Sequence, residues 1–247
     1  MSAEPLSSRI DLGRGLTLPN PVGLASGTAG YGFELEQLIG IDRLGALFTK
    51  GTTVAPRGGN PPPRVAEMGG GMLNSIGLQN PGIDVVARDY APRWRRWTIP
   101  VIVNLAGGSV DEYVHCAHVL EPVPEVAGIE LNISCPNIAG GLDFGRDPVA
   151  AARLVGAVRA VTERCVIVKL SPNVTDIGAV ARAVENAGAD AVSAVNTYIG
   201  RKIHRATGRS VSSTLICTSR SSVNTSSDLM NRGQRQSRCI FASAAIA

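Results

Sequence analysis

Aromatic residues are scarce in this chain, at 4% of 247 residues. Its five cysteines, at positions 116, 135, 165, 217 and 239, form no CxxC pair, which gives no support for a disulfide framework or a zinc site. No apolar run reaches the roughly 18 residues that a membrane span requires. The N-terminal residues Met1–Pro5 lack the basic-then-apolar pattern of a signal peptide. These absences predict a reduced, cytoplasmic protein.

The net charge of +4 comes from the end of the chain. Residues 201–247 contain eight of the 24 basic side chains and one of the 20 acidic ones. That leaves 16 basic and 19 acidic side chains in residues 1–200, a net charge of −3. A nucleic-acid-binding role would therefore depend on the tail, whose one aromatic residue for base stacking is Phe241.

Short apolar runs alternate with stretches of helical spacing through residues 1–200. Hydrophobicity within the runs is continuous, which is typical of parallel strands covered on both faces. The alternation predicts six βα units, as in a (β/α)8 barrel or a doubly wound sheet. The expected strands are Val22–Ser26, Ala46–Lys50, Pro100–Leu105, Gly128–Ile133, Cys165–Leu170 and Ala191–Val195. The expected helices are Phe33–Ile39, Ile83–Trp97, Val110–Leu120, Pro148–Thr162 and Ile177–Ala187, with Asp147 as a cap before Pro148.

The positions of the polar residues favour the barrel. They follow the apolar runs, where the active sites of barrels assemble: Ser26, Lys50, Asn104, Asn132, Cys135, Lys169 and Asn196. Gly23–Gly27 does not match the GxGxxG loop that would favour a doubly wound sheet. We therefore expect an incomplete (β/α)8 barrel of about six βα units over residues 1–200. The serine-rich residues 201–247 are expected to form a disordered or irregular tail.

Two further segments draw attention to chemistry. The long loop Gly51–Gly82 is expected to be irregular and functional, and its part Asn74–Gly82 offers amides and backbone without charge, which suits a neutral hydrogen-bonding ring. Cys135 lies between Asn132 and Asn137, just after an apolar run. Taken alone, this thiol is either a base or nucleophile, or the small buried hydrophobe that most free cysteines are.

Motifs at the strand ends and in the long loop carry a resemblance to a known family: Ala25–Thr28, Thr49–Thr52, Asn74–Gly82, Asn104, Asn132–Asn137, Lys169–Asn173 and Asn196–Thr197. Together these motifs resemble the class 1 dihydroorotate dehydrogenases, FMN-dependent (β/α)8 enzymes of pyrimidine biosynthesis. Gln79 and the cysteine are similar to the 1B subtype, whose catalytic subunit pairs with a subunit carrying FAD and an iron–sulfur cluster and passes electrons to NAD. The resemblance also implies a homodimer or a heterotetramer.

The resemblance implies oxidation of (S)-dihydroorotate to orotate, with Cys135 as the base and FMN as the hydride acceptor. A thiol of ordinary pKa, about 8.5, predicts activity that rises on the alkaline side. The implied substrate-binding residues are Lys50, Asn74, Ser75, Ile76, Gly77, Leu78, Asn132, Asn196 and Thr197. The implied cofactor-binding residues are Ser26, Lys50, Gly51, Asn104, Asn132, Lys169 and Val195, and no metal is implied.

The resemblance ends just after Gly200. We expect a chain that is truncated or frameshifted after about residue 200, which reading the source nucleotide sequence in all three frames would test. An incomplete barrel has two open edges, which predicts weak FMN binding and low stability. Two alternatives remain open: another FMN-barrel reductase acting on a different pyrimidine or on uridine in RNA, and a non-catalytic fragment.

Overall fold

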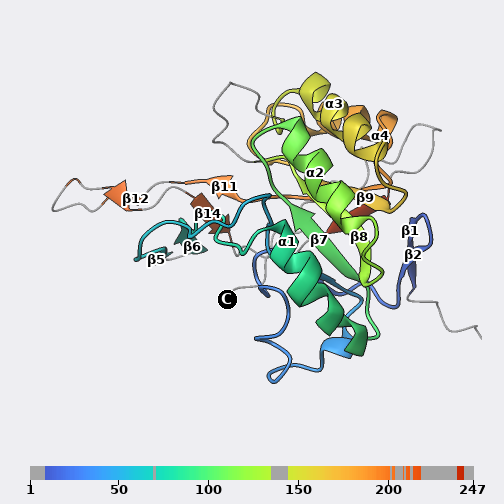
Figure 1. Cartoon of the computed structure of the whole chain (residues 1–247). Coiled ribbons are helices and arrows are strands. Elements are labelled where there is room, and N and C mark those ends of the chain that lie inside the picture. The colour runs from blue at the N-terminus through green and yellow to red at the C-terminus, as the bar shows by residue number, and fades with distance from the viewer. Residues whose placement is uncertain are drawn as a thin grey trace, which may run out of the picture.

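A seven-stranded parallel sheet forms the centre of the fold (Figure 1). The computed structural model describes residues 9–68, 71–134, 144–200, 202–203, 208, 210–211, 214–217 and 238–241. Strand order is β15-β10-β9-β8-β7-β4-β3, and within the described residues the outer strands β3 and β15 do not pair with each other. The sheet is therefore open, as expected of an incomplete barrel. Its strands are β3 (Gly23–Leu24), β4 (Ala46–Phe48), β7 (Val101–Leu105), β8 (Val126–Asn132), β9 (Cys165–Lys169), β10 (Ala191–Ala194) and β15 (Arg238–Phe241).

All six strands predicted from the sequence are confirmed, within two residues at each end. Three predicted helices are confirmed as α2 (Val110–Leu120), α3 (Pro148–Arg159) and α4 (Ile177–Asn186). The Asp147 carboxylate accepts from Val149 N at 2.8 Å, which confirms the predicted cap. In Figure 1 these helices lie together along the sheet. No helix in the described part of the chain is long and apolar enough to cross a bilayer.

Two helix predictions are wrong in whole or in part. Residues 33–39 form turns, and the side chain of Leu38 is 76% exposed. Their apolar spacing therefore gives no continuous buried stripe to hold a helix. The second segment is helical but divided into α1 (Ile83–Val85), the π-helical η2 (Val86–Tyr90) and the 3₁₀ helix η3 (Ala91–Arg96). Pro92 at the start of η3 has no N–H to continue an α-helical ladder.

Alternation along the strands divides the apolar residues into two cores. Leu131, Val166 and Val168 face outward into the core that the helices cover. Phe48 and Ile167 face inward and pack with an amino-terminal hairpin, β1 (Ile10–Gly13) and β2 (Leu16–Leu18). The hairpin thus plugs the amino-terminal end of the barrel, which the sequence analysis did not predict.

The long loop and the tail contain more sheet than expected. Within the loop predicted to be irregular, β5 (Val65–Met68) and β6 (Gly71–Asn74) form an antiparallel hairpin. Strand β14 (Thr214–Cys217) adds to β6, β11 (Tyr198–Ile199) adds to β14, and this sheet projects from the barrel in Figure 1. In the tail, β12 (Lys202–Ile203) pairs with β13 (Ser210–Val211), and β15 extends the central sheet beside β10. The described parts of the tail are thus short strands, and the rest of it lies outside the described residues.

Candidate active site

Polar side chains gather at the carboxyl ends of the parallel strands, as the sequence predicts. Parallel strands end at one edge of a sheet, so residues that follow them are brought to one mouth. The predicted base Cys135 lies outside the described residues, within 135–143. The described members of this group are Ser26 after β3, Lys50 and Gly51 after β4, Asn104 on β7, Asn132 ending β8, Lys169 ending β9, and Val195, Asn196 and Thr197 after β10.

Lys169 is a buried cation at this mouth. Its side chain is 6% exposed, and Nζ donates to Ser26 Oγ at 2.8 Å, which joins the ends of β9 and β3. A lysine ammonium has three N–H donors. Among the described residues Ser26 is its hydrogen-bond partner, so donors remain for an anionic or carbonyl group of a ligand.

A buried carboxylate lies below the mouth and holds two neighbours. Glu130 on β8 is 1% exposed, and its two oxygens accept from Asn104 Nδ2 on β7 and from Ser193 Oγ on β10, the latter at 2.7 Å. Asn104 Oδ1 is fully buried and has no hydrogen-bond partner among the described residues. An acceptor in that state predicts that a donor is supplied from outside the protein.

Two predicted substrate-binding asparagines meet directly. Asn196 Nδ2 donates to Asn132 Oδ1 at 2.8 Å, and Asn196 Oδ1 accepts from Thr197 N at 2.8 Å. The Tyr113 hydroxyl donates to the Asn132 carbonyl at 2.6 Å, which anchors the end of β8 on α2. None of the described residues accepts from Asn132 Nδ2, so this amide is left to donate to a ligand.

The Asn74–Leu78 segment lies next to the strand ends. Asn60 Nδ2 donates to Ser75 O at 3.1 Å and to Ser75 Oγ at 2.9 Å, and Arg64 donates to the Gly58 carbonyl at 3.1 Å. A Cβ placed on Gly51 would come within 3.3 Å of Leu78 Cδ2, so the loop folds back over β4. The side chains of Ser75 and Leu78 are half-buried, as is the backbone of Gly77 between them.

Lys50 is half-buried beside this loop. Burial lowers the pKa of its ammonium below 10.5, the nearby Arg64 charge lowers it further, and Glu34 acts in the opposite direction. Burial has removed water from the lysine ammonium, and an anionic ligand nearby would stabilise its charged form again. The position therefore suits contact with a carboxylate, and a solvated surface lysine would show no such burial.

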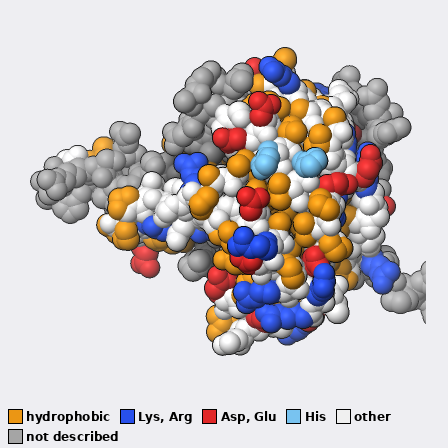
Figure 2. Space-filling model, viewed as in Figure 1, with side chains coloured by type: hydrophobic (Ala, Val, Ile, Leu, Met, Phe, Trp, Pro, Cys, Tyr) orange, Lys and Arg blue, Asp and Glu red, His pale blue; other side chains and the backbone are white. Residues whose placement is uncertain are grey.

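The three arginines of η3, Arg93, Arg95 and Arg96, do not form a surface patch of positive charge alone. Figure 2 shows acidic side chains interspersed with the basic ones on this face. Arg96 pairs with Glu36, Arg95 pairs with Glu125, and the Arg93 guanidinium lies 3.6 Å from the centre of the Phe33 ring. Each of these three arginines therefore already has a partner among the described residues.

Glu130 and Ser193 are site residues that the sequence analysis missed. A signal for Glu130 was available, because it is the one charged residue in the apolar run Gly128–Ile133 and alternates with Asn132. Ser193 gave no comparable signal, since a serine in a strand is ordinary. Only the placement of β7, β8 and β10 around one interior shows that these side chains meet.

An open parallel sheet covered by helices, with polar residues at its carboxyl edge, defines an enzyme-type α/β barrel. The family model described as dihydroorotate dehydrogenase matches residues 13–214. The chain belongs to the dihydroorotate dehydrogenase family.

Curated relatives agree with this assignment. The chain is 52% identical over 190 residues to the dihydroorotate dehydrogenase B (NAD(+)) catalytic subunit of Geotalea daltonii, covering 76% of this chain and 62% of that protein. It is 50% identical over 198 residues to the protein of the same name from Geobacillus kaustophilus, covering 80% and 63%. The like-named Porphyromonas gingivalis protein is 47% identical over 208 residues, covering 84% and 68%. The chain thus spans about three fifths of the length of the first two of these relatives.

Proposed function

We propose that this chain acts as a class 1B dihydroorotate dehydrogenase catalytic subunit, oxidising (S)-dihydroorotate to orotate in pyrimidine biosynthesis. The observation that carries the proposal is the convergence of Lys169, Asn104, Asn132 and Asn196 at one barrel mouth, in a chain of this family. A partner subunit with FAD and an iron–sulfur cluster would pass the electrons to NAD. The relatives' names support the part of this proposal that concerns NAD(+) and a second subunit, since they print NAD(+) and a catalytic subunit.

The residues of the mouth fit FMN. The flavin ring carries one N–H flanked by two carbonyls, and Asn104 Oδ1 is a buried acceptor that lacks a donor. Lys169 offers N–H donors and a positive charge, which suits the carbonyl edge and the anionic reduced ring. Gly51 adds no side chain over Asn104, and Ser26 holds the lysine in place. When bound, FMN supplies the two-electron acceptor that no amino-acid side chain provides.

The substrate contacts follow from the same residues. Dihydroorotate carries a carboxylate and a ring with N–H donors and carbonyl acceptors. Asn132 Nδ2 and the half-buried Lys50 supply donors for the carbonyls and the carboxylate, while Asn196 and Thr197 hold Asn132 in position. The uncharged Asn74–Leu78 loop would close over the ring and exclude water.

The chemical step balances with one base and one hydride acceptor. The Cys135 thiolate removes the proton from C5, which is acidic because a carbonyl is adjacent, and the hydride leaves C6 as the C5–C6 double bond forms. In the sequence Cys135 stands three residues after Asn132, the last residue of β8, which supports its assignment as the base. The base and the hydride acceptor must lie on opposite faces of the substrate ring.

Anaerobic reduction tests this proposal. The purified chain is equilibrated with FMN and mixed with dihydroorotate, and both the loss of oxidised-flavin absorbance and the formation of orotate are measured. Cys135→Ala is the matched variant, expected to keep FMN and to lose most of the reduction. Bound FMN that dihydroorotate leaves oxidised would refute the proposal, and reduction of uracil or uridine instead would support the alternative reductase. Absence of FMN binding would support the non-catalytic fragment.

A further inference from the structure

We propose that Glu130 is a positioning residue that orients the amide of Asn104, so that the barrel mouth selects a ligand with an N–H donor. The inference deepens the proposed function, because the ligand in question is the flavin ring. It concerns a carboxylate that no sequence motif assigned to the site.

Glu130 lies inside the barrel. Its neighbours Ile129 and Leu131 belong to the outer core, so alternation turns the Glu130 side chain inward. It contacts β7 through Asn104 and β10 through Ser193, and β10 is two strands away from β8 in the sheet. Side chains on β8 and β10 can meet across the intervening β9 only where they converge on the concave side of a curved sheet.

The two hydrogen bonds to Glu130 determine which way the Asn104 amide is turned. Both Glu130 oxygens act as acceptors, so Asn104 must turn its Nδ2 towards the carboxylate. The amide is planar, and its Oδ1 then points the other way. That oxygen is the buried acceptor without a partner. A glutamine at position 130 would offer a donor as well, and the Asn104 amide could then adopt either orientation.

Gly51, one of the predicted cofactor-binding residues, lies next to this oxygen. A Cβ added to Gly51 would lie 3.0 Å from Asn104 Oδ1, so any other residue at position 51 would crowd the acceptor. The same added Cβ would lie 3.3 Å from Leu78 Cδ2. A ligand bound against Gly51 therefore meets an acceptor and must supply a donor, which the flavin N3–H does.

A purely structural role explains Glu130 poorly. Burying a carboxylate is costly unless it is paired or fully hydrogen-bonded, and within the described residues Glu130 has two neutral donors and no ion-pair partner. Ser193 and Asn104 could be held by a neutral side chain at lower cost. What a carboxylate adds is that it accepts and never donates when ionised, which leaves Asn104 one orientation.

The test measures binding of FMN and of 3-methyl-FMN, whose N3 carries a methyl group in place of the proton, by equilibrium dialysis. The proteins are the full chain, Glu130→Gln, Asn104→Ala, the double variant and Ser193→Ala. Far-UV circular dichroism and thermal unfolding without ligand verify folding of each. Ser193→Ala is the matched control, because it removes one hydrogen bond to Glu130 without freeing the Asn104 amide.

We expect the unaltered chain to bind FMN at least about tenfold more tightly than 3-methyl-FMN, the effect of losing one well-placed hydrogen bond. Glu130→Gln should reduce that preference to within about twofold of the preference shown by Asn104→Ala, and the double variant should show no further loss. Ser193→Ala should keep most of the preference. Anaerobic flavin reduction in Glu130→Gln should saturate at the unaltered rate but need more FMN.

Two results would overturn the inference. One is equal binding of the two flavins by the unaltered chain, a measurement that needs no variant to fold. The other is additive loss from Glu130→Gln and Asn104→Ala, which would mean that Glu130 acts independently of the amide. In both cases FMN is bound, so the proposed function would stand; absence of FMN binding would overturn both.

Discussion

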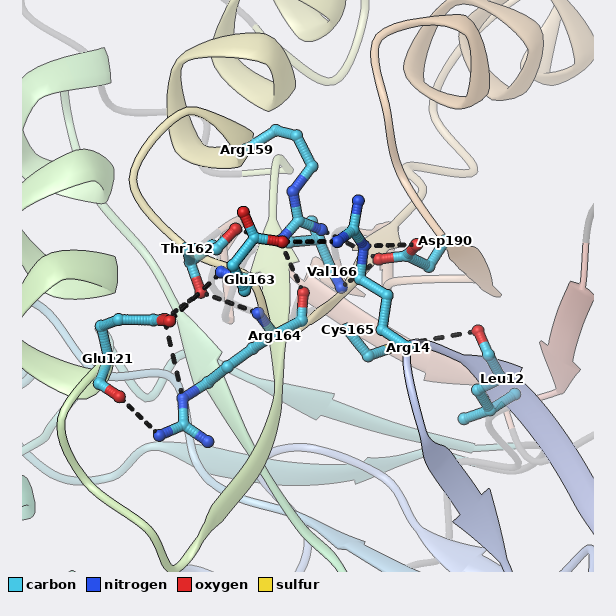
Figure 3. A network of polar contacts seen from close by, with 10 residues as sticks. All are labelled: Leu12, Arg14, Glu121, Arg159, Thr162, Glu163, Arg164, Cys165, Val166 and Asp190. Atoms are coloured by element: carbon cyan, nitrogen blue, oxygen red, sulfur yellow. Dashed lines mark hydrogen bonds and ion pairs between the residues drawn. The ribbon is translucent and has the colours of Figure 1, made fainter.

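The replacement Asp190→Ala is expected to destabilise the protein more than any surface ion-pair change. Figure 3 shows its carboxylate on one side of a polar network, where it contacts Arg14, Arg159 and Val166 at the start of β9. Oδ2 accepts from Arg159 at 3.0 Å and from Val166 N at 2.9 Å, and Oδ1 accepts from Arg14 at 3.1 Å. Asp190 therefore ties the β1–β2 turn and α3 to the start of β9.

The expected magnitude follows from burial. The side chains of Asp190 and Arg159 are 17% and 14% exposed, whereas Arg14 is 39% exposed. Breaking a fully buried pair costs about 3–5 kcal/mol, and an exposed pair contributes about 0.2–1 kcal/mol. Because burial here is incomplete, we expect Asp190→Ala to lower the free energy of unfolding by about 3 kcal/mol. Asp190→Asn keeps one acceptor oxygen, so its free energy of unfolding should lie between those of the unaltered chain and Asp190→Ala.

Urea unfolding followed by far-UV circular dichroism measures the loss by linear extrapolation. The matched control is Asp89→Ala, because the Arg88–Asp89 pair has side chains that are 69% and 45% exposed. The control should leave the free energy of unfolding nearly unchanged, because solvent screens an exposed pair. A loss in Asp190→Ala no larger than the loss in the control would refute the reasoning, since burial would then not decide the strength of the pair.

Three further predictions concern pH, the loop and the base. Burial raises the pKa of the Cys116 thiol from 9.0 to about 12, so between these pH values the folded state keeps a proton that the unfolded chain loses, and stability falls as pH rises. The urea midpoint should therefore fall less steeply with pH in Cys116→Ala than in the unaltered chain. Equal slopes of midpoint against pH would contradict this. Gly77 has φ 76°, and a Cβ added there would lie 2.7 Å from Asn60 N, so Gly77→Ala should distort the loop and raise KM for dihydroorotate about tenfold or more. The control Gly156→Ala adds a methyl group to open space on α3 and should leave KM unchanged. The rate of flavin reduction by dihydroorotate should rise through pH of about 8.5, the ordinary thiol pKa, and Cys135→Ser should lose this rise in a stopped-flow pH profile; an unchanged profile would rule out the thiol as base.

Local pattern was sufficient for six of the seven parallel strands and for three helices, and it missed β15 in the tail. Short continuous apolar runs such as Cys165–Leu170 are typical of strands with both faces covered, and α3 carries its own start signal in Asp147 and Pro148. The pattern failed at residues 33–39, because helical spacing predicts a helix only where a neighbour covers the apolar stripe. It failed again at β5 and β6, which form a hairpin, and it gave no sign that β14, far away in the sequence, pairs with β6.

The sequence by itself determined the class of the fold, the family and the set of polar residues at the strand ends, because each of these depends on the order of residues along the chain. Tertiary structure decided which of them meet. The contacts of Lys169 with Ser26, of Asn132 with Asn196, and of Glu130 with Asn104 and Ser193 join residues between 26 and 143 positions apart. They arise because the curved sheet brings the ends of separate strands around one interior, where a buried carboxylate can orient an amide that no local pattern connects to it.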